Sequence, residues 1–382
     1  MQEPSRRDVV ALLATGDLII DEPDPDAYFD LARPVLSAAD VVVGHVEVPF
    51  TLRREGTPNV PREARDPAKL GALARAGVRV ASLAANHLFD EGEAGVQDTL
   101  AGLRAQGILP FGAGLTLDEA RRPAWLECHG MRLGFLSYNC VGTEQSWAGT
   151  RKAGGAYVHV LTHYQLDHAT PGGTPKVFTG AEAESLEAMK ADIAHARDAC
   201  DFVSVSLHKG TVHTPALVMP YEKQIARAAV DAGADLVVSH HAHILGGIEV
   251  YRGKPIYHGL GNFVTVTHAL SPQGVTDPND WAMRRLKLFG FVPDPETPEY
   301  PFHPESRNTL LAKCVLDASG WVEPRFLPVQ INRRSQPEVL GHDTRGDAVL
   351  DYVRDITHRA GFTTRFCWDG DEVLVLPDHL GG

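Results

Sequence analysis

Short apolar runs alternate with helical segments along the first 240 residues, and this alternation is what most constrains the fold. The runs are rich in β-branched and aliphatic residues, as in strands that are buried on both faces. Six strands are predicted, at Val9–Ala14, Val41–Val43, Val78–Leu83, Arg132–Ser137, Phe202–Leu207 and Leu236–Val238. Strands that alternate with helices predict βαβ units and a mostly parallel sheet.

The helical segments between these strands carry apolar residues at helical spacing. They are expected at Pro67–Ala76, Gly95–Gln106, Ala181–Cys200 and Pro220–Ala232. Gly77, Gly107 and Gly233 follow three of them, where glycine accepts the left-handed conformation that ends a helix. The chain is therefore predicted to be an α/β protein.

The last third of the chain has a different pattern. A Pro-rich acidic stretch at Pro293–Pro304 predicts a loop. After it, a strand is expected at Thr309–Leu316, a helix at Gly346–Ala360 and a hairpin at Thr364–Leu376. We divide the chain into a main domain at 8–270, an insertion or lid loop at 271–308, and a C-terminal α/β extension at 309–382 that packs on the core.

Composition excludes several classes of partner and site. The net charge is −13 and no basic stripe occurs, so no nucleic-acid partner is expected. No apolar run approaches the roughly 20 residues that span a bilayer, and no membrane partner is predicted. The five cysteines form no CxxC pair, which argues against a thiolate metal site and is typical of a reducing compartment. No signal peptide is recognised, and a cytoplasmic location is expected.

Metal-ligating side chains follow the predicted strands. They are Asp17, Glu47, Asn86 with His87, His208, and His241 with His243. Each has an ordinary structural explanation when taken singly, such as a helix cap or a turn. As a set they are expected to meet at one edge of the sheet, where α/β proteins build their sites. Carboxylate, amide and imidazole donors suit Mn, Fe or Zn, and Glu47 is of the type that bridges two ions about 3.5–4 Å apart.

Motifs at these positions resemble the CapA family of capsule and poly-γ-glutamate synthesis proteins, within the calcineurin-like metallophosphoesterase superfamily. The resemblance covers roughly residues 10–270. It rests on Gly16-Asp17, Glu47-Val48-Pro49-Phe50-Thr51, Ala85-Asn86-His87-Leu88-Phe89-Asp90, Ser206-Leu207-His208, Gly233-Ala234-Asp235, His241-Ala242-His243, Lys254-Pro255-Ile256-Tyr257 and Gly261-Asn262-Phe263.

The resemblance implies a four-layer αββα sandwich of mixed sheets flanked by helices. It also implies a ligand set of one or two divalent ions. Asp17 and His243 would bind one ion, Asn86, His208 and His241 the other, and Glu47 would bridge them. His87 would then act as the general acid, supported by Asp90.

The chain departs from the superfamily pattern at three places. Asp17-Leu18-Ile19 stands where the superfamily has Asp-x-His, so one ligand of the first ion is missing. His45 replaces an Asn, and Lys209 replaces the Trp of a His-Trp-Gly motif. A Lys ammonium beside the site would repel a metal ion unless it points away. We predict Lys209, His45 and Arg284 as substrate-binding residues.

The segment around 265–310 has two interpretations. It is either a surface insertion or a lid that offers cations such as Arg284 to an anionic substrate, with His303 as an acid–base group.

Three functions remain open for a chain of this kind, each with a small-molecule or peptide substrate. The first is a metal-dependent hydrolase of a phosphoester or of a peptide or γ-glutamyl amide. The second is a peptide epimerase of a ribosomal-peptide pathway, in which Asp17 and a histidine exchange a Cα proton without metal. The third is a non-catalytic protein that binds a polymer or peptide.

Overall fold

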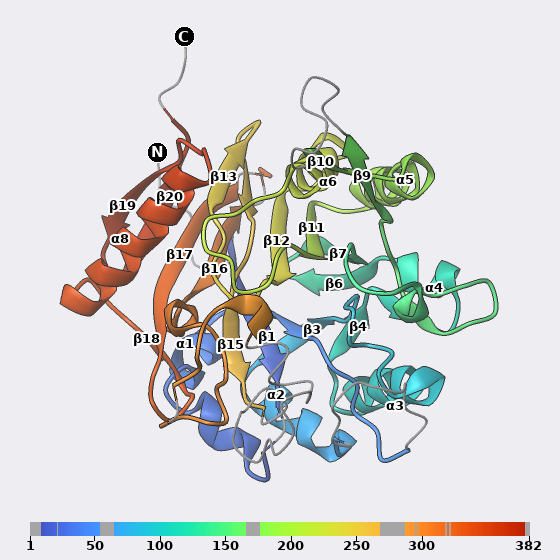
Figure 1. The fold of residues 1–382 in the computed structure, drawn as a ribbon, viewed down its shortest axis with the longest axis horizontal. Helices are drawn as coiled ribbons and strands as arrows, with labels where there is room; N and C mark the ends of the chain where they lie inside the picture. Colours follow the sequence, from blue (N-terminus) through green and yellow to red (C-terminus); the bar gives the residue numbers. More distant parts are fainter. Residues whose placement is uncertain are drawn as a thin grey trace.

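The protein is described here by a computed structural model, which covers residues 9–20, 22–53, 65–165, 176–267, 287–294, 296–317, 319–320 and 322–378. Within these residues the chain forms two mixed β-sheets of different size, with helices around them (Figure 1). Ten strands make up the large sheet, in the order β19-β20-β17-β16-β1-β2-β3-β4, with β15 paired to β1 and β18 to β17. Six strands make up the small sheet, in the order β13-β14-β12-β11-β7-β6.

The bounds of the elements are as follows. The large sheet contains β1 (Val9–Ile19), β2 (Val41–Val46), β3 (Val78–Ser82), β4 (Leu109–Phe111), β15 (Asn262–Thr265), β16 (Asn308–Asp317), β17 (Val322–Ile331), β18 (Pro337–Val339), β19 (Arg365–Asp369) and β20 (Glu372–Leu376). The small sheet contains β6 (Ala124–Cys128), β7 (Met131–Asn139), β11 (Phe202–Lys209), β12 (Leu236–His241), β13 (Ile248–Tyr251) and β14 (Lys254–Tyr257). Two short pairs join β5 (Ala113–Gly114) to β8 (Gly154–Gly155) and β9 (Val160–Gln165) to β10 (Lys176–Ala181). The helices are α1 (Arg33–Ala38), α2 (Gly71–Arg75), α3 (Gly92–Ala105), α4 (Leu117–Arg121), α5 (Ala183–Ala199), α6 (Pro220–Asp231) and α8 (Thr344–Arg359), with 3₁₀ turns η1 (Pro25–Phe29), η2 (Pro67–Leu70), η3 (Glu144–Ser146) and η4 (Pro304–Arg307).

Three apolar cores separate four layers, which confirms the predicted αββα arrangement. The first core lies between the large sheet and α1, α2 and α3, and contains Leu36, Leu73 and Leu100. The second lies between the two sheets, where Leu12 and Val43 of one sheet and Phe135, Leu236 and Val238 of the other belong to one cluster. The third lies between the small sheet and α5 and α6, and contains Met189, Ile225, Val205 and Val237. Because side chains alternate along a strand, each sheet can bury both faces in this way.

The C-terminal extension joins the large sheet directly. β16 pairs antiparallel with β1, and β17 continues the sheet on its far side. Leu350, Val353 and Ile356 of α8 reach the core between the sheets, and in Figure 1 this helix lies beside β17. The strands up to β15 were expected to be mostly parallel, and β1–β4 with β15 are. The antiparallel strands of the large sheet come from the C-terminal extension, and they make this sheet mixed. The domain boundaries at 270 and 308 remain predictions.

Most predicted elements form where the pattern placed them, but several strands run further than expected. β1 continues to Ile19, β2 to Val46, β7 to Asn139, β11 to Lys209 and β12 to His241. β1 is longer because of long-range pairing, since Asp17 lies opposite both His45 of β2 and Asn262 of β15. The register is irregular before Asp17 in the first pair and after it in the second. Asp17, His208 and His241 therefore lie within strands, not after them. Gly77, Gly107 and Gly233 have φ values of +98°, +73° and +118°, as the predicted helix ends require.

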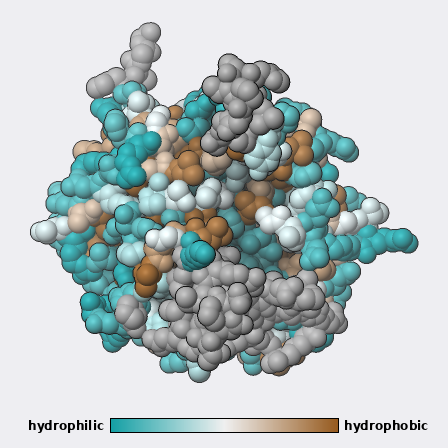
Figure 2. Space-filling view, in the orientation of Figure 1, coloured by the Kyte–Doolittle hydropathy of each residue, from teal (hydrophilic) through white to brown (hydrophobic). Residues whose placement is uncertain are grey.

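The face of the molecule in Figure 2 is largely hydrophilic toward its rim, with apolar residues gathered nearer its centre. No helix in the described part of the chain combines the length and apolar character needed to cross a membrane.

Candidate metal centre

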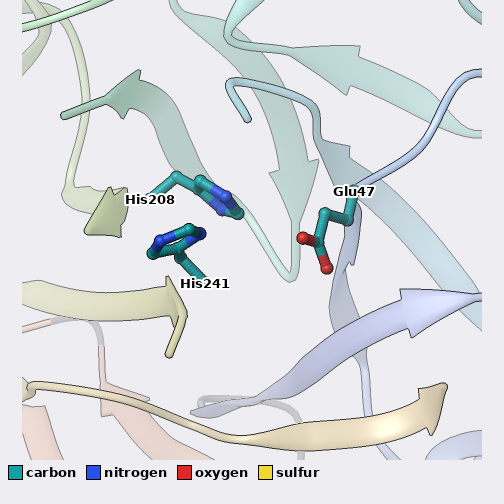
Figure 3. A group of neighbouring side chains, drawn as sticks. All are labelled: Glu47, His208 and His241. Carbon is teal, nitrogen blue, oxygen red and sulfur yellow. The ribbon is translucent and has the colours of Figure 1, made fainter. Parts of the chain in front are cut away.

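The carboxyl ends of strands from both sheets bring the predicted ligands together. Glu47 directly follows β2 of the large sheet, and Asp17 lies in β1 beside it. His208 and His241 lie at the ends of β11 and β12 of the small sheet. Figure 3 shows the Glu47 carboxylate facing the imidazole rings of His208 and His241 from the opposite sheet.

These side chains form two candidate ligand groups that share Glu47. One group contains Glu47, His208 and His241, and the other contains Asp17, Glu47 and His243. Within each group, the ligand atoms all lie within 4.8 Å of one another. The structure thus places together five of the six residues predicted as ligands, in the two sets that the resemblance implied. Asn86, the sixth, lies with its Oδ1 2.7 Å from Nε2 of His208.

The donors of this cluster fit a divalent ion. Asp17 and Glu47 are 0% exposed, and their four carboxylate oxygens accept no hydrogen bond from the described residues. A buried carboxylate without such partners is costly unless a cation compensates it. His243 lies within ion-pair distance of both, with Nδ1 3.1 Å from Oδ2 of Asp17 and Nε2 3.4 Å from Oε1 of Glu47. Carboxylate and imidazole together suit Mn, Fe or Zn.

The charges within the cluster influence one another. Burial raises the pKa of Asp17, and the nearby charge of Glu47 raises it further. Burial also opposes ionisation of Glu47, but the adjacent His243 outweighs it and holds the pKa of Glu47 below its usual range. Burial opposes protonation of His243, yet the two carboxylates raise its pKa well above the ordinary value. These directions favour an ion pair between the Glu47 carboxylate and the His243 imidazolium.

The backbone around the histidine pair is strained. His241 and His243 have φ values of +90° and +53°, in the region that favours glycine. Non-glycine residues held there cost of order 1–3 kcal/mol each and cluster at functional sites. The end of β12 and the turn after it thus hold the imidazoles of His241 and His243 in the cluster at a cost in stability.

A chain of hydrogen bonds fixes the ring of His208. Ser82 Oγ lies 2.6 Å from Nδ1 of His45, and Nε2 of His45 lies 2.9 Å from Nδ1 of His208. Burial lowers the pKa of both imidazoles well below the ordinary value, so each is neutral. Both ring nitrogens of His45 are used in this chain. The prediction that His45 binds substrate is therefore wrong, since it orients His208 from inside the sandwich.

His87 and Asp90 form the predicted pair at the rim of the cluster. Nδ1 of His87 lies 2.8 Å from Oδ2 of Asp90, and about a third of the His87 side chain is exposed (34%). Burial opposes protonation of His87, but the hydrogen bond and charge of Asp90 raise its pKa above the ordinary value. The arrangement suits a proton donor held beside the cluster.

Lys209 does not contact the cluster. It follows His208 on β11, so its side chain lies on the opposite face of the sheet, where it is 0% exposed. Its Nζ lies 2.9 Å from Oε2 of Glu222 and 3.1 Å from Nδ1 of His258. His258 in turn contacts Glu249 at 3.1 Å. The prediction that Lys209 binds substrate is therefore wrong, and its ammonium points away from the metal ligands.

We expect Lys209→Met to lower stability without changing metal content. The substitution leaves Glu222 buried without its cation, which typically costs about 3–5 kcal/mol. Urea unfolding measures the loss, and the double variant Lys209→Met/Glu222→Gln is expected to recover most of it. A Lys209→Met protein of unchanged stability would show that the buried pair contributes nothing.

The other predicted residues lie elsewhere. Arg284 falls outside the described residues. His303 precedes η4 and its Nδ1 accepts a hydrogen bond from the Glu305 amide at 3.2 Å, while its ring packs edge-on against Phe291. The structure gives no contact between His303 and the ligand groups among the described residues. Its acid–base role remains a prediction.

Sequence reasoning missed several residues around His243. Oδ1 of Asn262 lies 2.9 Å from Nδ1 of His243, and the ring of Phe302 packs 5.0 Å from the imidazole. His213 stacks on His243 from a third segment, with 5.9 Å between ring centroids. Asn262 belongs to the Gly261-Asn262-Phe263 motif, which offered a signal for its role. No comparable signal marked Phe302 or His213.

A known protein family matches the part of the chain that contains these ligands. The family described as bacterial capsule synthesis protein PGA_cap matches residues 11–267. The chain belongs to this family. That range includes all six predicted ligands and ends before the segment that carries Tyr300 and Phe302.

Curated relatives of this PGA_cap protein come from several bacteria. The PGA biosynthesis protein CapA of Bacillus subtilis is 28% identical over 269 residues, covering 67% of this chain and 63% of that protein. A probable polyglutamine synthesis accessory protein of Mycobacterium tuberculosis is 30% identical over 232 residues, covering 60% of this chain and 56% of that protein. The match thus covers less than two thirds of the length of either relative.

Solved structures show only distant similarity. A hypothetical protein from Thermus thermophilus has 14% identity and a TM-score of 0.44, covering 83% of this chain and 99% of that one. A calcineurin-like phosphoesterase of Bacillus subtilis has 10% identity and a TM-score of 0.37, covering 92% and 98%. Similarity at this level says nothing about the reaction of the PGA_cap chain.

Proposed function

We propose that this PGA_cap protein is a metal-dependent hydrolase. Its substrate would be a small molecule or peptide with a phosphoester or an amide bond, including a γ-glutamyl amide. The observation that carries the proposal is that two ligand groups share Glu47. The names of two relatives refer to PGA and polyglutamine synthesis, which supports including a γ-glutamyl amide among the candidate bonds.

In this proposal one set of residues binds the metal ions and another transfers a proton. Asp17, Glu47 and His243 would hold one Mn, Fe or Zn ion, and Glu47, His208 and His241, with Asn86, the other. Ions in such a site supply Lewis-acid polarisation and make water a better nucleophile. The carboxylates of Asp17 and Glu47 would supply the negatively charged ligand atoms, and the strained backbone at the end of β12 holds the imidazoles of His241 and His243 in place.

His87 would protonate the leaving group. Its Nδ1 contacts Asp90, which leaves Nε2 to donate a proton when the bond breaks. Although burial opposes protonation, the hydrogen bond and charge of Asp90 raise the pKa of His87 above its ordinary value, which favours the protonated imidazole that a general acid requires. The exposed third of its side chain gives a substrate access to the ring.

A second candidate function is peptide epimerisation, and one contact favours it. Oδ2 of Asp17 and Nδ1 of His243 lie 3.1 Å apart, so a carboxylate and an imidazole are close enough to exchange a proton directly. Ile19 supplies no ligand where the superfamily pattern has a histidine, and it is buried in β1. In an epimerase, the Asp17–His243 pair would remove the Cα proton from one face, and a second histidine on the other side of the substrate would return a proton to the opposite face of the carbanion.

Two measurements on the purified full chain separate these functions. The hydrolase predicts bound transition metal and loss of phosphoester or amide cleavage after chelation. The epimerase predicts deuterium uptake at a peptide Cα in heavy water without cleavage, unaffected by chelator. A protein without transition metal, whose activity survives chelation, would exclude the hydrolase. Cleavage with no deuterium uptake over a broad peptide set would exclude the epimerase.

A further inference from the structure

The segment that follows the family region reaches His243 in two ways, by ring packing of Phe302 and by hydrogen bonds from a buried tyrosine through Asn262. Tyr300 is 2% exposed and its hydroxyl accepts a hydrogen bond from Nδ2 of Asn262 at 3.0 Å. Asn262, which is 0% exposed, presents its Oδ1 to Nδ1 of His243 at 2.9 Å. A continuous path of hydrogen bonds therefore runs from Tyr300 to His243.

The direction of each hydrogen bond in this path is determined. The single proton of the Tyr300 hydroxyl is directed to Ser306, whose carbonyl oxygen lies 2.9 Å away. The hydroxyl oxygen is then an acceptor for Asn262, so the amide must present its NH₂ group to Tyr300 and its oxygen to His243. Nδ1 of His243 donates to that oxygen, which leaves Nε2, the nitrogen 3.4 Å from Glu47, to bind an ion.

The tyrosine is itself firmly held. Its ring lies 5.0 Å from that of Phe302 and beneath the guanidinium of Arg307, at 4.9 Å. Arg307 donates to the carbonyl of Asn332 at 2.7 Å and thereby ties the segment to the end of β17. A fixed ring on a fixed segment can impose an orientation on Asn262.

We propose that Tyr300 is a positioning residue for His243, acting through the amide of Asn262. The proposal rests on the proposed function in so far as His243 binds metal. The region after residue 267, which the family does not cover, thus supplies part of the site. Partners of this kind typically account for about 10–100-fold in metal affinity.

The test compares Tyr300→Phe with a matched control, Tyr352→Phe. The first variant keeps the packed ring and removes only the hydroxyl. The second removes a hydroxyl that contacts Glu305 at 3.1 Å, close to the same segment but outside the path to His243. Mn²⁺ is titrated calorimetrically into each metal-free chain. We expect about 10-fold weaker binding for Tyr300→Phe and unchanged binding for Tyr352→Phe.

A second measurement on metal-free protein keeps the two proposals separate. Histidine is labelled with ¹⁵N, and the ring signals of His243 are assigned with a His243→Gln variant. We expect Tyr300→Phe, but not Tyr352→Phe, to shift these signals.

If the wild-type chain binds no Mn²⁺, the metal proposal fails and the ¹⁵N signals alone decide the role of Tyr300. Unmoved signals overturn that role, as does unchanged Mn²⁺ affinity in a chain that binds the ion. Should Tyr300→Phe not fold, Asn262→Ala is expected to give the same shift and the same loss.

Discussion

Replacing Glu47 with Gln is expected to weaken binding of both metal ions by more than about 100-fold, the upper range for residues that only support a ligand. Glu47 belongs to both ligand groups, so one substitution affects both. Gln keeps the size of the side chain and removes its charge. Asp17 then remains the one carboxylate of the two groups.

Metal analysis and Mn²⁺ titration measure this effect. Glu187→Gln serves as a control, because Glu187 lies in α5 with 67% of its side chain exposed and forms an ion pair with Lys190. The control is expected to bind metal like the wild-type chain. A Glu47→Gln protein that retains both ions at full affinity would show that Glu47 bridges nothing.

Replacing His87 with Gln is expected to lower kcat by about 10²–10⁴-fold, which is the usual contribution of a general acid or base. Metal content is expected to stay unchanged, since His87 belongs to neither ligand group. This combination separates a proton donor from a ligand. Asp90→Asn is expected to give a smaller loss, because it leaves the imidazole in place but removes the charge that favours its protonation.

The measurement is steady-state hydrolysis of a chromogenic phosphoester by the metal-loaded chain. His195→Gln is the matched control, since His195 lies exposed on α5, outside both ligand groups. It is expected to leave kcat unchanged. If His87→Gln keeps wild-type turnover, the leaving group takes its proton from another source.

Local patterns were sufficient to predict most of the helices and strands. Glycine after an amphipathic stretch ended the helices at Gly77, Gly107 and Gly233, because a positive φ is a local requirement. The ends of strands were less predictable, since they depend on partners far away in the chain. β1 extends past Asp17 only because β2 and β15 pair with it there. The antiparallel half of the large sheet depends on the extension in the same way.

The same distinction applies to the candidate site. The ligand types and their strand-end positions were visible in the sequence, and the structure gathers four of the other predicted ligands around Glu47. The sequence did not show which partners a side chain meets in the folded protein. Lys209 follows His208 and therefore lies on the other face of β11, where its partners Glu222 and His258 come from distant segments. Tyr300 likewise reaches His243 only through Asn262, and no local pattern marks such a contact.

Metal content of the purified wild-type chain, measured beside Glu47→Gln, tests the central claim most directly. Inductively coupled plasma mass spectrometry gives the number of Mn, Fe and Zn ions per chain after loading and removal of free metal. The structure predicts one or two ions per wild-type chain and a large loss in Glu47→Gln. A wild-type chain that takes up none of these metals would contradict the claim that the Glu47 cluster is a metal centre.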